Sequence, residues 1–555
     1  MGIPDFWPLI SRVGEPRSLM ELITFEALKR RSKGQSLPVI GVDASPIMYE
    51  AQGAVIRARG NGGSWSRIGR NTECRTLSMH LEQLARLPAT IVIVFDGPKR
   101  PDLKRGTHTS CKEHYLTKQF RQLNDGFGFH TWTAPGEAEA ELASLNKLGA
   151  VDFVLTSDSD IFMFGAPHII RSPQLSKNRD LVETYNLSES GFYSVDSEGI
   201  SPAGAVLVAV LSGGDYSGKG LENCGIKTAW ALMKTDLGPG LFEILNGQDP
   251  GHLQTHANLV GWRNQLCREL RYSPHLKSHR PELASKVPGT FPSSRVVDLY
   301  VNPVTSLSEF STEHPDRHYI APIWDVAFPD SARMAKIACQ LFDWDWERTL
   351  EFLRDFVWPG EFVRRILHQG PLGPGASSAA SVEHEALGIQ SIQRIIAQCI
   401  YSKSGASATF PYFQVKVSID TAHAKASRAF HREMCVPNVQ RIPRDSASRL
   451  WVPGFILLTA APDHLDSYFK KASLRGKRPR LQNMRIRLAV LCPWLDQPAM
   501  AESLPALPAT VSLPAIPPAQ PAILPGPDSH SGPSGVTYIV HAQKGSQGEI
   551  IEILD

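Results

Sequence analysis

Acidic side chains follow three short apolar runs near the start of the chain, with a spacing suited to binding divalent cations. The β-rich runs and their acids are residues 38–45 with Asp43, residues 89–97 with Asp96, and residues 151–160 with Asp158 and Asp160. Carboxylate oxygens are hard ligands, which suit Mg²⁺ or Mn²⁺ better than metals that prefer imidazole or thiolate. Two such ions a few ångströms apart can drive in-line attack of water on a phosphodiester.

Three further acids are candidates for the same set. Glu137 and Glu139 follow a Pro-Gly pair at a predicted helix start, and Asp215 follows a Gly-Gly pair after a predicted helix. On a regular helix, residues two apart point about 200° away from each other, whereas Glu137 and Glu141 share a face. The residues alone therefore leave both pairings open, because Glu139 can join Glu137 only in an irregular first turn.

The elements that would position these acids alternate between strand-like and helix-like segments over the first 235 residues. Such alternation is typical of a mostly parallel α/β sheet with helices on both faces. Ligands bind such sheets at the C-terminal ends of the strands, so we expect the acids to converge on one crevice. A single Asp after a strand is more often a turn residue or a helix cap. Acids at three strand ends together favour a shared ligand-binding site over unrelated turn residues.

The rest of the chain divides by composition into a helical region, a linker, a small β-rich domain and a tail. The predicted units are an α/β core over 1–200, a helical region over 201–368, a linker over 369–388, a β-rich domain over 389–472, and a basic patch with a Pro-rich disordered tail over 473–555. Within them we expect a helix over 112–123, strands over 392–400, 412–419 and 450–459, and a helix over 462–471.

The overall composition excludes several classes of protein. It is not that of a collagen, a disulfide scaffold or a wholly disordered chain, and the eight cysteines form no CxxC pair. We find no signal peptide and no apolar run near the roughly 18 residues of a membrane span. These features predict a soluble intracellular protein with no membrane partner. The net charge of +3 does not exclude nucleic acid, because local basic patches can be cancelled in the sum.

Motifs over residues 1–235 resemble, in order, those of the XPG/flap-endonuclease family of structure-specific nucleases. The matching segments are Met1-Gly2-Ile3, Val42-Asp43-Ala44-Ser45, Phe95-Asp96-Gly97, Ala134-Pro135-Gly136-Glu137-Ala138-Glu139-Ala140, Ser157-Asp158-Ser159-Asp160 and Gly214-Asp215-Tyr216. The resemblance implies a PIN-like fold and a two-ion Mg²⁺ endonuclease, with Mn²⁺ as a substitute. It assigns the first ion to Asp43, Asp96, Glu137 and Glu139, and the second, mainly through water, to Asp158, Asp160 and Asp215. We follow the family at Glu139 and keep Glu141 in reserve.

The same resemblance assigns residues to DNA binding. Tyr49 corresponds to an aromatic that stacks beside the scissile phosphate, and Lys104 to a catalytic cation that polarises this phosphate. Residues 215–229 resemble a helix–two-turn–helix, in which backbone N–H groups and a bound K⁺ hold duplex phosphates. Asn223 stands where the family has Gly, and Asn tolerates a left-handed backbone better than most residues. The expected DNA-binding residues are Gly2, Tyr49, Lys104, Arg105, Lys112, Lys219, Gly220, Gly225 and Lys227. For the lysines, a solvated surface is the alternative.

Two features are similar to the Holliday-junction resolvase branch of the family. Only 40 residues separate Asp96 from Glu137, which is too short to enclose a threaded single strand. Residues 392–471 resemble the chromodomain of those resolvases, with a turn at Trp451-Val452-Pro453-Gly454, and we expect this domain to contact DNA. The predicted function is therefore cleavage of branched DNA, with two subunits pairing on a four-way junction. The alternatives are a 5′-flap or bubble endonuclease and a non-catalytic protein that binds branched DNA.

Two segments near the C-terminus suggest further interactions. Residues 470–480 hold six basic residues in eleven, a pattern typical of a nuclear-localisation or nucleic-acid-binding segment, and we expect a nuclear protein. Residues 549–555 form an apolar run flanked by acids, which resembles a SUMO-interacting strand.

Overall fold

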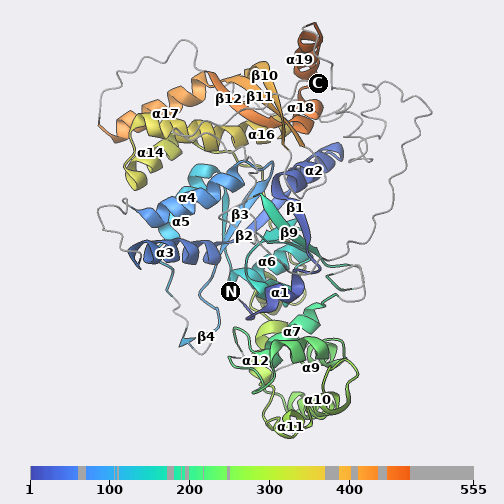
Figure 1. The fold of residues 1–555 in the computed structure, drawn as a ribbon. Coiled ribbons are helices and arrows are strands. Elements are labelled where there is room, and N and C mark those ends of the chain that lie inside the picture. The colour runs from blue at the N-terminus through green and yellow to red at the C-terminus, as the bar shows by residue number, and fades with distance from the viewer. Residues whose placement is uncertain are drawn as a thin grey trace, which may run out of the picture.

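A seven-stranded sheet lies at the centre of the molecule, with helices on both faces and a smaller sheet at one end (Figure 1). The computed structural model describes residues 2–60, 71–104, 107–108, 112–171, 180–188, 191–193, 199–216, 218–246, 250–368, 387–401, 410–435 and 447–474. No helix among these residues has both the length and the apolar composition that crossing a bilayer requires.

The central sheet is mostly parallel, as the alternating pattern predicts. Its order is β1 (Glu15–Ser18), β9 (Leu181–Asn186), β8 (His168–Arg171), β7 (Phe153–Leu155), β2 (Val39–Asp43), β3 (Thr90–Phe95) and β6 (His130–Thr133). The five strands from β8 to β6 run parallel, whereas β9 and β1 add an antiparallel edge. Every residue of β2 and β3 is buried, because helices cover a central parallel strand on both faces.

Helices pack on the two faces of the sheet through alternating strand side chains. Those of the N-terminal core are α1 (Phe6–Ile10), α2 (Leu19–Ser32), α3 (Ala44–Gly60), α4 (Thr72–Ala85), α5 (Thr117–Phe127) and α6 (Ala138–Lys147). Ile91 and Ile93 of β3 pack in one hydrophobic cluster with residues of α2 to α5. Val92 and Val94 point to the other face and pack with α1, α6 and a later helix, α7 (Pro202–Ser212).

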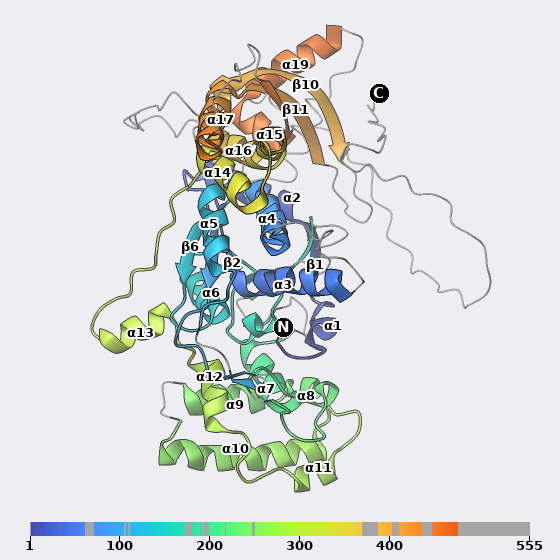
Figure 2. The same ribbon diagram turned by 90° about the vertical axis from the view of Figure 1, so that its left-hand side faces the viewer.

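A group of helices lies beneath the sheet in Figure 1. It comprises α7 (Pro202–Ser212), α8 (Ile226–Leu232), α9 (Leu237–Leu245), α10 (Leu253–Tyr272), α11 (Pro281–Ser285) and α12 (Ser294–Val301). The helix α13 (Ser306–Glu313) stands apart at the side, and the two-residue strands β4 (Leu103–Lys104) and β5 (Thr107–His108) pair near this lower group (Figure 2).

The opposite end of the molecule holds a three-stranded antiparallel sheet and its helices. The elements are α14 (Ser331–Phe342), α15 (Trp346–Phe352), the π-helical turn Leu353–Val357, α16 (Trp358–His368), β10 (Ile392–Tyr401), β11 (Phe410–Ser418), α17 (Asp420–Glu433), β12 (Ala447–Pro453), α18 (Gly454–Ala460) and α19 (Pro462–Leu474). Residues 201–368 therefore contribute helices to both ends of the molecule. The predicted domain boundaries stay predictions.

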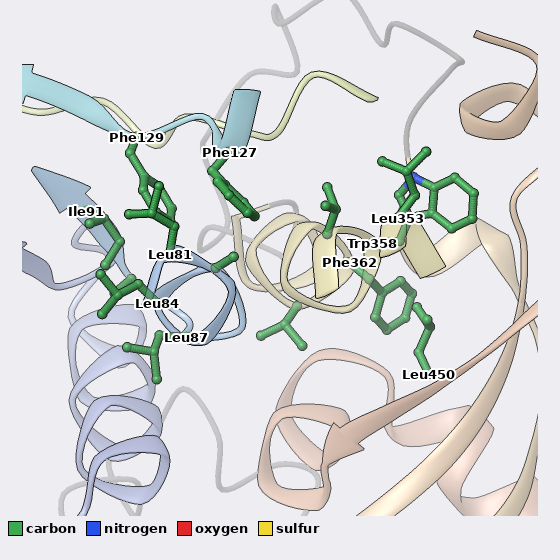
Figure 3. Close-up of a cluster of buried hydrophobic side chains, with 14 of the residues drawn as sticks. Leu81, Leu84, Leu87, Ile91, Phe127, Phe129, Leu353, Trp358, Phe362 and Leu450 are labelled. Carbon is green, nitrogen blue, oxygen red and sulfur yellow. The ribbon is translucent and has the colours of Figure 1, made fainter. Parts of the chain in front are cut away.

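One hydrophobic cluster joins the central sheet to the small sheet (Figure 3). Trp358 and Phe362 of α16 are fully buried in this cluster, which also holds Leu84 of α4 and Leu450 of β12, and Phe362 lies next to Leu450. Gly360 lets α16 approach closely, because a Cβ there would lie 1.6 Å from the Ala85 carbonyl oxygen. The small sheet is thus packed on the α/β core through α16 rather than separate from it.

Two predicted elements differ from the structure in their bounds, and one helix was not predicted. The strand predicted over 450–459 ends at Pro453, where Gly454 begins α18, so Trp451-Val452-Pro453 is the end of a strand rather than a turn. The helix predicted over 112–123 is α5, which begins at Thr117. The helix α17 was missed, although the apolar spacing of Ala422, Ala426 and Phe430 is helical.

Candidate metal centre

Three strand ends bring their acids to one edge of the central sheet. Asp43 is the last residue of β2, Asp96 directly follows β3, and Asp158 lies three residues beyond β7. Because β2 pairs with both β3 and β7 in parallel, their C-terminal ends lie next to one another. This is the edge at which α/β sheets bind ligands, as the sequence predicts.

Gly97 lets the loop after β3 approach the loop that carries Glu137. A Cβ on Gly97 would lie 1.8 Å from the Ala134 carbonyl oxygen, so no other residue fits. The Gly97 N–H donates to the Gly136 carbonyl at 2.7 Å, and the Ala138 N–H donates to the Asp96 carboxylate at 2.9 Å. The first turn of α6 is therefore hydrogen-bonded directly to Asp96, a predicted metal ligand.

The backbone at Glu137 decides which glutamates face the centre. Glu137 is extended, with φ −86° and ψ 142°, and α6 begins only at Ala138. Glu139 offers a ligand atom within 4.8 Å of those of Asp158 and Asp160. Glu141 points elsewhere and accepts hydrogen bonds from the Trp132 indole and the Ser306 N–H, both at 2.8 Å. The structure thus groups Glu137 and Glu139 with the other acids, and not the reserve residue.

Asp158 and Asp160 lie together, although not on the extended segment that their spacing suggests. Asp158 caps a 3₁₀ helix over Ser159–Phe162 and accepts from the Asp160 N–H at 3.2 Å. Gly2 packs against this pair with φ +82°, and a Cβ there would lie 2.5 Å from a carboxylate oxygen of each aspartate. The N-terminal segment therefore forms part of the wall of the centre.

Lys104 lies inside the acidic cluster. Its ammonium is 2.9 Å from Glu137, 2.9 Å from Asp215 and 3.9 Å from Glu139. Burial lowers the pKa of Lys104, but Glu139, Glu137 and Asp215 outweigh this and raise the pKa well above its ordinary value. Lys104 therefore stays protonated and supplies a positive charge to the cluster.

The cluster is nevertheless short of positive charge and of hydrogen-bond donors. Asp158 and Asp160 are fully buried, and Asp43, Glu139 and Asp215 are at most 5% exposed. Five buried carboxylate oxygens of the cluster have no hydrogen-bond partner among the described residues: Oδ2 of Asp43, Oε2 of Glu139, Oδ2 of Asp158 and both oxygens of Asp160. Buried anionic oxygens without partners are costly unless a cation neutralises them.

The pKa shifts have the same origin. Burial, reinforced by the charge of Asp96, raises the pKa of the Asp43 carboxyl well above its usual range. Burial together with the charge of Asp158 does the same for the pKa of Glu139 and of Asp160. An all-oxygen set with unpartnered anionic atoms fits Mg²⁺ or Mn²⁺, so the residues present suit the expected metal.

Sequence reasoning missed several polar side chains that orient these acids. Ser45 donates its hydroxyl to Asp96 at 2.8 Å and its N–H to Asp43 at 2.9 Å. Arg100 lies 3.4 Å from the Asp96 carboxylate, and the Tyr216 hydroxyl donates to Glu137. Ser45 and Tyr216 stand in the quoted motifs, and Arg100 is four residues beyond Asp96, so their positions were the available signal.

Two of the predicted DNA contacts, Tyr49 and Lys112, lie on the side of the centre next to Asp96. Tyr49 of α3 is 52% exposed and meets the His114 ring edge-on at 5.4 Å. A shallow pocket beside Asp96 is lined by Tyr49, Arg100 and His114 among others. Lys112 is exposed, and its carbonyl accepts from Arg100 at 3.0 Å. Arg105 lies outside the described residues.

The segment 215–229 has the turn geometry that the resemblance implies. Asn223 adopts φ +65°, so it takes the left-handed conformation for which the family uses Gly. Gly220 has φ +66° and no room for a Cβ, which would lie 2.4 Å from the Gly213 nitrogen. Gly225 precedes α8, and Lys219 and Lys227 are exposed. The roles of these residues and of K⁺ stay predictions.

Comparisons with known proteins agree with the motifs. Residues 128–215 match the family model of the XPG I-region. The human flap endonuclease GEN homolog 1 is 35% identical over 265 residues, which are 44% of this chain and 26% of that protein. The chain spans 21% to 49% of the length of the first curated relatives that it matches.

Solved structures share the fold. A eukaryotic junction-resolving enzyme GEN-1 bound with caesium has a TM-score of 0.61 and 24% identity, covering 85% of this chain and 100% of that chain. The Holliday junction-resolving enzyme GEN1 in complex with product DNA and Mg²⁺ has a TM-score of 0.58 and 23% identity, with the same coverage. The expected PIN-like α/β fold with a small β-sheet beyond it is therefore confirmed.

Proposed function

Because the chain carries an XPG I-region and is related in sequence to the flap endonucleases, we propose that it is a Mg²⁺-dependent, structure-selective DNA endonuclease. The observation that carries the proposal is the meeting of seven acids at one sheet edge, where five buried carboxylate oxygens find no partner in the described part of the chain. The seven are Asp43, Asp96, Glu137, Glu139, Asp158, Asp160 and Asp215. A binding surface for a polyanion gains nothing from such a cluster unless cations occupy it.

The acids divide into two groups that would hold two ions. Asp43, Asp96, Glu137 and Glu139 would hold the first, and Asp158, Asp160 and Asp215 the second. When bound, Mg²⁺ or Mn²⁺ supplies an activated water and neutralises the charge that develops on the phosphate. The second group lies deepest, since Asp158 and Asp160 are fully buried.

The chain's own residues would orient the acids and the DNA. Ser45 and the Ala138 N–H fix the Asp96 carboxylate, and Tyr216 fixes Glu137. Lys104, which is 23% exposed, is within reach of a phosphate at the mouth of the centre and would offset its charge. Tyr49 would stack on the adjacent nucleotide, since half of its surface is free.

A four-way junction is the favoured substrate. Between Asp96 and Glu137, the described residues contain one short hairpin, the helix α5 and the strand β6 of the central sheet. The helix α5 packs on α4 and α14 rather than projecting. An arrangement of this size suits a substrate without a free end to thread. A 5′-flap or bubble substrate is the alternative, since the curated relatives include flap endonucleases.

Further partners follow from the same proposal. Two subunits would pair on one junction, each cutting one of two opposing strands. The small sheet of β10, β11 and β12 would contact DNA, and the protein would act in the nucleus, as the basic run 470–480 suggests. Residues 475–480 of that run and the SUMO-like segment 549–555 lie outside the described residues, and the SUMO-type partner stays a prediction.

The test is cleavage of a static four-way junction, a 5′ flap and a linear duplex by the full chain with Mg²⁺. We expect paired nicks on the junction, little cutting of the duplex, and no cutting by Asp158→Asn, which should still bind the junction. Cutting confined to the flap would favour the alternative substrate. Tight junction binding without cutting in either Mg²⁺ or Mn²⁺ would instead favour a non-catalytic binding protein.

A further inference from the structure

A short stretch of the lower helices carries more positive charge than the whole chain. Residues 263–286 contain six Lys or Arg and only two Glu, a formal charge of +4, whereas the chain totals +3. The helix–two-turn–helix segment 215–229 contains two lysines and two acids, so its formal charge is zero. The segment expected to hold duplex phosphates thus lacks the positive charge that such binding uses.

The basic stretch is held in a defined shape. It forms the second half of α10, a turn and α11. The Arg280 N–H donates to the Leu270 carbonyl at 2.6 Å, and the Ser273 N–H to the Glu269 carbonyl at 2.9 Å. Leu276 and Leu283 are buried beneath the turn. The turn therefore presents its charged side chains from a fixed backbone.

Its cations have no acidic partners among the described residues. Arg268, Lys277, Arg280 and Lys286 are exposed, and Arg271 is partly exposed. None of the five makes an ion pair or a side-chain hydrogen bond within the described part of the chain. Elsewhere on the molecule, exposed arginines such as Arg17 and Arg333 lie within 3.0 Å of an acid. The five cations are therefore available to an anionic partner.

The stretch lies close to the helix–two-turn–helix. Burial raises the pKa of Cys224, within that segment, to about 12, and the positive charge of Arg280 acts on the same thiol in the opposite direction. Leu221 and Cys224 of that segment belong to the same hydrophobic cluster as Leu276 and Leu283 of the basic stretch, so the two segments pack in one part of the molecule. The helices α8 and α11 also lie in the same lower part of the molecule (Figure 2).

We propose that Arg268, Arg271, Lys277, Arg280 and Lys286 form a phosphate-binding surface, continuous with residues 215–229, for the duplex arm of the DNA. The inference rests on the proposed function for the identity of its ligand. Long cationic side chains without a shape-specific pocket bind the backbone and not the bases, so the surface is indifferent to sequence. It would supply electrostatic affinity beyond that of the two lysines in segment 215–229, whose net formal charge is zero.

Duplex DNA is favoured over single-stranded DNA by the side chains present. Single strands are held mainly by aromatic rings on which successive bases stack. The only exposed aromatic residue that the structure describes between residues 263 and 286 is Tyr272. A cationic surface with so few aromatic rings for base stacking suits the phosphate backbone of duplex DNA.

The experiment compares two triple variants of the full chain that remove equal charge. The test variant is Arg268→Gln, Lys277→Gln and Arg280→Gln, and the control is Lys33→Gln, Lys336→Gln and Arg354→Gln, exposed residues away from the lower helices and outside the domain 392–471. Fluorescence anisotropy would follow binding of a labelled 20-base-pair duplex and a 20-base single strand in EDTA over a range of salt. Thermal unfolding would check that both variants fold.

We expect the test variant to lose at least tenfold in duplex affinity. The slope of log affinity against log salt should fall by about 2 to 3, since each phosphate contact contributes roughly 0.9. The control should stay within twofold of the wild type. Equal losses in both variants, or an unchanged salt slope in the test variant, would overturn the proposal, as would a loss confined to the single strand.

The outcome is separate from that of the nuclease proposal. Binding is measured without divalent metal, so it does not depend on cleavage. A wild type that binds duplex through these residues but never cuts a junction would leave the surface standing and refute the nuclease. A wild type that cuts junctions while the test variant binds duplex normally would do the reverse.

Discussion

Replacing Asp160 by Asn should stabilise the metal-free protein. Asp160 is fully buried, neither of its carboxylate oxygens has a partner among the described residues, and the ligand atoms of Glu139 and Asp158 lie within 4.8 Å. Two unit charges at that distance repel by roughly 3.5 kcal/mol at an effective dielectric constant of about 20. Protonation within the cluster relieves part of this repulsion, so we expect a gain of about 1–3 kcal/mol.

The assay is thermal unfolding in EDTA, where this gain corresponds to a rise in Tm of about 1–3 °C for a folded unit of roughly 400 residues. A matched control is Asp152→Asn, next to the opposite end of β7, where the carboxylate accepts from the Val39 N–H at 2.7 Å and pairs with Arg30. That variant should lose about 1–3 kcal/mol, because a paired charge is removed. With Mg²⁺ added, the wild type should gain stability and Asp160→Asn should gain less. A lower Tm for Asp160→Asn in EDTA would refute the reasoning.

Three further predictions follow from the same contacts. The pKa values of Asp43, Glu139 and Asp160 are raised, so the folded protein binds more protons than the unfolded chain above about pH 4, and the stability of the metal-free protein should fall as pH rises. The increase in Tm on adding Mg²⁺ should therefore be larger at pH 8 than at pH 5.5. An equal increase at the two pH values would contradict this. Glu141→Gln should lower the free energy of unfolding by about 1–3 kcal/mol, because Trp132 or Ser306 would lose its acceptor, but it should keep the full increase in Tm on adding Mg²⁺. Glu139→Gln should reduce that increase. A reduced increase for Glu141→Gln would place residue 141 in the metal centre. Trp358→Ala should cost about 3–5 kcal/mol and expose 447–474 to proteolysis; an unchanged cleavage pattern would show that α16 does not hold the small sheet.

The strand ends could be predicted from sequence because the central strands are nearly all apolar. Residues such as Ile40, Val42, Ile91 and Ile93 are buried on one face and their neighbours on the other, so the runs stand out and end where the acids begin. The parallel order of β7, β2 and β3 then brings those ends together. This is why the sequence alone predicts an acidic crevice.

Other features depended on backbone and long-range contacts that no pattern reveals. The choice of Glu139 over Glu141 follows from the extended backbone of Glu137 and from Trp132 and Ser306, which engage Glu141. Lys104 is brought among the acids by the hairpin of β4 and β5, whose strands of two residues each are too short to predict from sequence. The roles of the predicted ligands and DNA contacts stay predictions.

The C-terminal region was predicted least well. A single hydrophobic run over 450–459 contains the end of a strand and the start of a helix, and the change occurs where Gly454 meets Phe413. Hydrophobicity alone does not separate the two.

The basic stretch 263–286 was also missed, because its charge is split between a helix, a turn and a second helix.

The account depends most on the claim that the acids at the sheet edge hold two divalent ions. The direct measurement is a crystal structure of the full chain soaked in Mn²⁺, with anomalous differences to locate the ions. We predict two peaks, one among Asp43, Asp96, Glu137 and Glu139 and one beside Asp158, Asp160 and Asp215, with Lys104 displaced from its present contacts. An anomalous map without a peak in the cluster, with Lys104 still bound to Glu137 and Asp215, would contradict the account.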